Sequence, residues 1–188
     1  MQATPSQTIG PFFHVCLPAD ETAGRLAGPG AEGEALTLIC RVLDADGAPV
    51  DDAMIELWQA DASGVYNHPD DPRYQDHDPA FPGFARAATD ENGECTFQTV
   101  RPGAVTEDDG AVHAAHINAS IFARGLLKRA VTRIYFEDDP ANADDPVLAC
   151  VPKQRRETLL ARRDSAQPWI WRHEIHLSGE RETVFFAI

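Results

Sequence analysis

The sequence predicts an all-β fold, specifically an antiparallel β-sandwich with an extended N-terminal arm and one short helix near the C-terminal third. Three observations support this prediction. Short runs rich in β-branched and aromatic residues recur along the chain, each bounded by Gly, Pro, Asn or Asp. Within several runs apolar and polar residues alternate, which is the period of a half-buried strand. The first 35 residues lack such runs and contain Gly and Pro clusters instead.

Residues 1–35 are therefore the predicted arm, and residues 36–188 form a single predicted domain. Strands are expected near 36–44, 53–60, 83–88, 94–100, 114–123, 130–137, 169–177 and 182–188. The runs at 83–88 and 94–100 are predicted to form a hairpin, because Asn92-Gly93 between them is a favoured turn sequence. The single helix is expected near 153–163, where Leu159 and Leu160 form a narrow apolar stripe.

Composition limits the classes of protein to consider. The chain has 188 residues, 43% of them hydrophobic, which is enough for one domain with a proper core. A formal net charge of -14 argues against nucleic-acid binding, which needs clustered Lys and Arg. An anionic substrate would need a local cation in such a chain. No run of about 18 apolar residues is present, so no membrane-spanning segment is expected.

The four cysteines, Cys16, Cys40, Cys95 and Cys150, contain no C-x-x-C pair. They are expected to be free, buried thiols in a reducing cytoplasm, since the N-terminus does not resemble a secretory signal.

Three common catalytic motifs are missing: the phosphate loop, the G-x-S-x-G elbow and the H-E-x-x-H helix. His173 and His176 lie three apart on a predicted strand, so they should point to opposite faces and should not share a metal. His116 and Asn118 lie two apart and should share one face, which Arg124 would continue. An amide is a poorer transition-metal ligand than imidazole, so this pair is not a convincing metal site.

Four blocks of the chain together resemble one enzyme family. They are "DADGAPVDDAMIELWQADASGVYNH", "FARAATDENGECTFQTVRPG", "AAHINASIFARGL" and "RETVFF", and the likeness runs from Thr4 to Phe186. The family is that of the intradiol ring-cleaving dioxygenases. The resemblance implies cleavage of a catechol ring between its two hydroxyl-bearing carbons with insertion of both atoms of O2. It also implies a non-haem Fe(3+) held by two tyrosinates and two histidines.

The ligand positions transfer only in part. By resemblance, Tyr66 matches the first tyrosine and His116 the first histidine, whereas Val105, next to Ala104, and Asn118 replace the other two ligands. From the residues alone, a Tyr at this position is more often a packing residue. Tyr66 and His116 are therefore interpreted as remnants of a site that no longer binds iron. The arm "TPSQTIGPF" and the block "HINASIFARG" favour the iron-free alpha chain of a two-chain member, whose iron is held by a beta subunit.

The same resemblance gives the arm a role: Thr8, Gly10 and Pro11 would line the mouth of the partner's iron pocket. The physical properties agree, because Gly10 permits close backbone approach and Pro11 reduces the ordering entropy of the arm. Phe12 and Phe13 would supply apolar docking area. The alternative is an arm that packs on its own domain.

Arg124 is the candidate for binding the carboxylate of an aromatic acid substrate, because arginine can form two parallel hydrogen bonds to a carboxylate. Eight residues of straight strand would place it roughly 26 Å from His116, too far to serve the remnant site. It would then serve the partner's pocket. The alternative is a salt bridge at a surface or an interface.

Two other functions remain open on the sequence. One is a homomeric enzyme that binds its own iron and acts on a simpler catechol. The other is a non-catalytic β-sandwich module that binds or carries a ligand.

Overall fold

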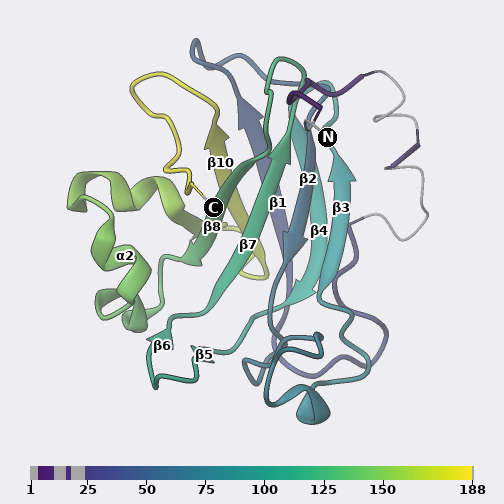
Figure 1. The fold of residues 1–188 in the computed structure, drawn as a ribbon, viewed down its shortest axis with the longest axis vertical. Helices are drawn as coiled ribbons and strands as arrows, with labels where there is room; N and C mark the ends of the chain where they lie inside the picture. Colours follow the sequence, from purple (N-terminus) through teal and green to yellow (C-terminus); the bar gives the residue numbers. More distant parts are fainter. Residues whose placement is uncertain (1–3, 11–15, 18–23, 188) are drawn as a thin grey trace.

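The structure is a computed structural model that describes residues 4–10, 16–17 and 24–187. Its strands are β1 (Ala35–Leu43), β2 (Met54–Trp58), β3 (Phe84–Ala88), β4 (Glu94–Val100), β5 (Val105–Thr106), β6 (Val112–His113), β7 (His116–Phe122), β8 (Ala130–Phe136), β9 (Leu160–Arg163) and β10 (Ile170–His176). Eight of them form one sheet in the order β3-β2-β7-β8-β9-β10-β1-β4, and β5 and β6 form a separate ribbon. The two edge strands, β3 and β4, lie close together, so the sheet is nearly closed (Figure 1). The prediction of an all-β fold is confirmed.

The pairing of strands differs from the purely antiparallel arrangement that was predicted. Most neighbours are antiparallel, but β1 pairs with β10 in parallel and β8 pairs with β9 in parallel. The predicted hairpin of residues 83–88 and 94–100 is also wrong. The turn itself forms, because Gly93 donates its N–H to Asp90 O and Asp90 donates to Glu94 O. Beyond the turn, however, β3 pairs with β2 and β4 with β1, so the two strands end at opposite edges of the sheet.

The helix predicted near 153–163 is wrong in type and length. Residues Lys153–Leu159 form a 3-10 helix, η3, and the chain continues as strand β9 from Leu160. Leu160 pairs with Tyr135 of β8, and this tertiary pairing overrides the local helical pattern. The α-helix in this region is α2 (Pro146–Cys150), which Asp145 caps by accepting from two backbone N–H groups; η1 (Tyr74–Asp76) and η2 (Pro140–Ala143) are short 3-10 turns.

The strand predicted at 182–188 is absent over 182–187, the part that the structure describes. The Thr183 N–H donates to His176 O of β10, and the Phe186 N–H donates to Val131 O of β8. Because these bonds go to two different strands, the segment crosses the sheet instead of aligning with one strand.

The predicted alternation along β7 is confirmed. Ile117, Ala119 and Ile121 are 0–1% exposed and face the core, whereas Asn118 and Ser120 on the other face are only half-buried. Leu26, in the predicted arm, is also fully buried in this core. All four cysteines are free, but only Cys40 and Cys95 are buried as predicted, because Cys16 and Cys150 are exposed. Among the described residues, no helix is long and apolar enough to cross a membrane.

Candidate functional site

Three of the predicted ligand positions meet at the start of β7. The Tyr66 hydroxyl oxygen lies 3.3 Å from His116 Nε2, and Asn118 Nδ2 donates to the same hydroxyl oxygen at 3.0 Å. The fourth position, Val105, opens β5 and lines a cavity together with Tyr66. The structure therefore brings together, in one region of the fold, the four positions that the resemblance matches to the ligands of the family.

The loop after β2 positions Tyr66. Asp61 Oδ1 accepts from the N–H groups of Ser63 and Val65, and this fixes the turn that precedes the tyrosine. Burial, the largest single influence, raises the pKa of Asp61, but the hydrogen bonds from Asp78, Ser63 and Val65 together lower it below its usual value. Gly64 has a φ of +82°, and a Cβ there would lie 2.0 Å from Ala104 O. The turn therefore requires glycine, because any side chain would force the loop away from the segment that holds Val105.

The polar atoms of this cluster satisfy one another. His116 Nδ1 lies 2.8 Å from Ala114 O, which can only accept, so Nδ1 carries the proton and donates. In the neutral ring Nε2 is then an acceptor for the Tyr66 O–H. The tyrosine oxygen in turn accepts from Asn118, which completes a hydrogen-bonded chain from backbone to amide.

Both titratable groups of the cluster are held neutral. Burial, the largest cause, raises the pKa of Tyr66 above its usual value of 10.0. Burial and, after it, the nearby Arg133 charge lower the pKa of His116 to about 4. At neutral pH the site therefore offers a neutral phenol, a neutral imidazole and an amide. Ferric ion prefers anionic oxygen donors, and this set could supply only one, the Tyr66 oxygen, because Val105 and Asn118 stand at two of the four ligand positions that the resemblance gives. The set therefore does not fit the metal that the family uses.

Arg133 is a residue of this site that the sequence reasoning missed. It lies on β8 directly opposite Asn118, and its Nη1 lies 3.1 Å from His113 Nδ1. His113 is itself 3.0 Å from Glu107 through Nε2. A guanidinium beside Tyr66 and His116 opposes a trivalent cation by charge repulsion. Within the described residues, no group of three or more His, Cys, Asp or Glu side chains could hold a metal ion.

Two other predicted residues meet at the opposite end of β7. The Gly125 N–H donates to the Thr8 hydroxyl oxygen at 2.8 Å, so the arm lies beside the residue that follows Arg124. Figure 1 shows residues 4–10 of the arm, in dark purple, at the end of β7 that is farthest from β5 and β6. The hydrogen bond thus places Thr8 beside the backbone that follows Arg124, at the end of β7 opposite to the one where Tyr66 meets His116.

Arg124 is 77% exposed, and its Nε lies 2.9 Å from Asp52 Oδ2. This is a surface salt bridge, the alternative considered for Arg124, although it engages only the Nε edge of the guanidinium. Gly10 is exposed, and a Cβ built on it would meet nothing within 4 Å, so its predicted close approach to a ligand finds no counterpart in the described part of this chain. Pro11, Phe12 and Phe13 lie outside the described residues. A role at a partner's pocket therefore stays a prediction for Thr8, Gly10, Pro11 and Arg124.

A nearly closed β-sheet with a tyrosine, a histidine and an asparagine grouped at the start of β7 fits the class of protein that the sequence resembles, and comparison with known proteins agrees with that class. The family profile described as "Dioxygenase" matches residues 8–178, and the chain belongs to this family, the intradiol ring-cleaving dioxygenases.

Among curated relatives, the chain is 44% identical to the protocatechuate 3,4-dioxygenase alpha chain of Pseudomonas putida, over 97% of this chain and 95% of that one. It is 39% identical to the alpha chain of Burkholderia cepacia, over 100% of this chain and 98% of that one. The beta chain of Burkholderia cepacia is 35% identical over 84% of this chain and 66% of its own length. The crystal structure of 3-chlorocatechol 1,2-dioxygenase from Rhodococcus opacus 1CP shares the fold, with a TM-score of 0.67, 22% identity, and coverage of 93% of this chain and 71% of that one.

Proposed function

We propose that this chain is the alpha-type subunit of a two-chain intradiol dioxygenase. The complex converts protocatechuate and O2 to 3-carboxy-cis,cis-muconate, and the iron is held by a beta-type subunit of the same family. The observation that carries the proposal is the cluster of Tyr66, His116 and Asn118, whose polar atoms are hydrogen-bonded to one another and whose titratable groups are neutral. The cationic side chain of Arg133 lies beside it. Full-length similarity to two alpha chains supports the same assignment.

In this proposal the chain performs no redox step, because the ferric ion of the partner supplies that chemistry. Its own residues bind the carboxylate of the substrate, hold the ring in a fixed orientation and exclude water. The proposal includes a division into an arm, residues 1–35, and one sandwich domain, residues 36–188. The free thiols agree with a reducing compartment, and we place the complex in the cytoplasm.

The end of β7 is the surface that we assign to the partner's pocket. The hydrogen bond between Thr8 and Gly125 holds the arm beside Arg124, so a partner that docks here would meet both at once. The bond from Nε to Asp52 orients the Arg124 guanidinium and leaves its two terminal nitrogens to receive a carboxylate. Gly10, which is exposed, would extend the same surface towards the substrate, and Pro11 keeps the role that the resemblance gives it.

The proposal is tested by expressing the chain alone and together with a beta-type relative, such as the Burkholderia cepacia beta chain. Iron content and cleavage of protocatechuate are measured in each sample. We expect little iron and no cleavage of protocatechuate from the chain alone. The complex should contain iron and should cleave protocatechuate. A red chain that holds about one iron without a partner would instead identify a homomeric enzyme. Failure to associate with the beta-type chain would favour a separate binding module.

The arm is tested by deleting residues 1–12 in the co-expressed complex. We expect a weaker assembly and lower ring-cleaving activity, measured by size-exclusion chromatography and by turnover at saturating protocatechuate. An unchanged complex with unchanged turnover would show that the arm only packs on its own domain.

A further inference from the structure

A second cavity lies on a different part of the fold, where strands β9 and β10 separate. The two strands pair only at Trp171 with Arg163 and at Arg172 with Arg162. Beyond these pairs β9 leads back to η3, and β10 continues alone on that side towards His176. The space between them has a volume of about 480 Å³. This is within the range of small-molecule pockets, and the cavity shares no lining residue with the one that contains Tyr66.

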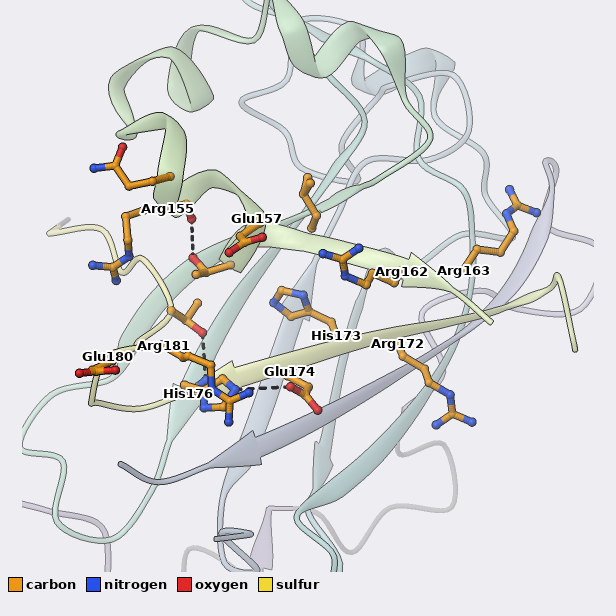
Figure 2. Close-up of a pocket in the computed structure, with 14 residues that line it drawn as sticks. Arg155, Glu157, Arg162, Arg163, Arg172, His173, Glu174, His176, Glu180 and Arg181 are labelled. Carbon is orange, nitrogen blue, oxygen red and sulfur yellow. Dashed lines mark hydrogen bonds and ion pairs between the residues drawn. The ribbon is translucent and has the colours of Figure 1, made fainter. Parts of the chain in front are cut away.

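His173 projects into this cavity from β10, between the two diverging strands (Figure 2). The residue is 2% exposed, and its Nε2 has no hydrogen-bond partner among the described residues. A buried ring nitrogen without a partner is costly, and such atoms are rare in folded proteins. His173 Nε2 is therefore a polar contact point for a molecule that enters the cavity.

The chemistry of Nε2 limits what that ligand can be. A hydrogen bond to the backbone of Leu160 raises the pKa of His173, so the ring donates in that bond, and it does so through Nδ1 because Nε2 is unpaired. Burial, the larger effect, lowers the pKa to about 4, so the ring is neutral at pH 7. In a neutral ring with the proton on Nδ1, Nε2 is an acceptor. The ligand must therefore present a donor such as a hydroxyl group.

A second buried atom without a partner belongs to another residue of the same lining, Arg155, and it is a hydrogen-bond donor. Arg155 donates through Nη2 to Glu182 O, but its Nε has no partner among the described residues. Arg181 also lines the cavity, without a salt bridge in the described part of the chain. The other three arginines of the lining, Arg162, Arg163 and Arg172, are paired with acidic residues outside the cavity. Arg155 and Arg181 are therefore the guanidiniums of the lining that could receive a carboxylate.

We propose that this cavity binds a small hydroxylated carboxylate, whose carboxylate accepts from Arg155 and Arg181 and whose hydroxyl donates to His173 Nε2. A metal cation is disfavoured by the guanidiniums of Arg155 and Arg181, which have no salt bridge among the described residues. A simple anion such as phosphate could accept hydrogen bonds from the arginines. At neutral pH, however, it would be a poorer hydrogen-bond donor to His173 Nε2 than an alcohol or a phenol. The site is independent of the proposed function, because it involves neither the partner subunit nor its iron.

The test uses the purified full-length chain without a partner and two matched pairs of probes: 4-hydroxybenzoate with benzoate, and malate with succinate. Binding is measured by calorimetric titration, and the ring nitrogens of the histidines are followed by NMR. We expect at least one hydroxylated probe to bind about fivefold or more tighter than its partner, because the probe without a hydroxyl leaves the buried acceptor unpaired. The His173 signal should shift on binding.

Two variants locate the site. Arg181→Ala removes an exposed side chain that lines the cavity and should weaken binding about fivefold, whereas Arg25→Ala removes an exposed arginine elsewhere and should not. His173→Phe should remove the preference for the hydroxylated probe. If that variant does not fold, the probe pairs and Arg181→Ala still decide the question. Equal affinities within both pairs, no binding by any of the four probes, or equal weakening by Arg25→Ala would overturn the proposal.

Discussion

Acid should destabilise this chain before its carboxylates are protonated, because two buried histidines must stay neutral for it to fold. Burial, the largest cause in each case, lowers the pKa of His116 and of His173 to about 4. In the unfolded chain both should titrate near 6.5. As pH falls from about 6.5 to about 4, the unfolded state therefore binds two protons that the folded state excludes. Stability is full above this window and is lost as pH falls through it.

The size of the effect follows from linkage. Each histidine costs about 1.4 kcal/mol of unfolding free energy per pH unit within the window, so each should remove about 2 kcal/mol at pH 5 relative to pH 7. Together they should remove about 4 kcal/mol, which is a large part of the stability of an ordinary domain. Asp61 and Asp138 have pKa values lowered from 3.8, so the stability that they contribute is lost only at more acidic pH.

The assay is urea unfolding of the purified chain at pH 7, 6 and 5, with the free energy of unfolding extrapolated to water. His173→Asn should remove about half of the pH dependence, whatever it does to stability at pH 7. Ile134→Val changes a fully buried residue without a titratable group, so it should lower stability by about 1 kcal/mol and leave the pH dependence unchanged. An unfolding free energy that stays constant between pH 7 and pH 5 would refute the reasoning.

Three further predictions concern the two ends of β7. In the assembled complex, Arg124→Ala should raise KM for protocatechuate about tenfold or more and change kcat little, since a charge-assisted bond to the substrate would be lost; a large fall in kcat at constant KM, measured by oxygen uptake, would contradict this. Thr8→Val removes the acceptor for the Gly125 N–H and should weaken the affinity for the partner by less than about tenfold in a titration of the two chains; complete loss of assembly would show a larger role. Asn118→His restores the H-x-H pattern but should not restore iron binding, because Arg133 faces the site; about one iron per chain by elemental analysis would disprove this.

The sequence predicts well where local pattern decides the structure. Apolar alternation identified β7 and the face on which Ile117 and Ile121 are buried, and the order of blocks identified the ligand positions that meet at Tyr66 and His116. These predictions depend on single strands or on family likeness. Neither requires the partner of a strand to be known.

The predictions fail where pairing between distant segments decides. Arg133 reaches the site only because β8 pairs with β7 in a register that places it opposite Asn118, and no local pattern encodes that register. The hairpin failed for the same reason: the Asn92-Gly93 turn forms, but longer-range pairing takes its two strands to opposite edges of the sheet. At Leu160, pairing with β8 replaced a helix with a strand.

The parallel pairing of β1 with β10 has a consequence for how the chain is made. Paired residues, such as Thr37 and Ile170, lie roughly 130 residues apart, so β1 cannot pair with β10 until almost the whole polypeptide has left the ribosome. Long-range closure of this kind makes folding slow and leaves the edge of β1 open while translation continues. A subunit built in this way should depend on chaperones during synthesis, and the yield of the complex should be set by that delay.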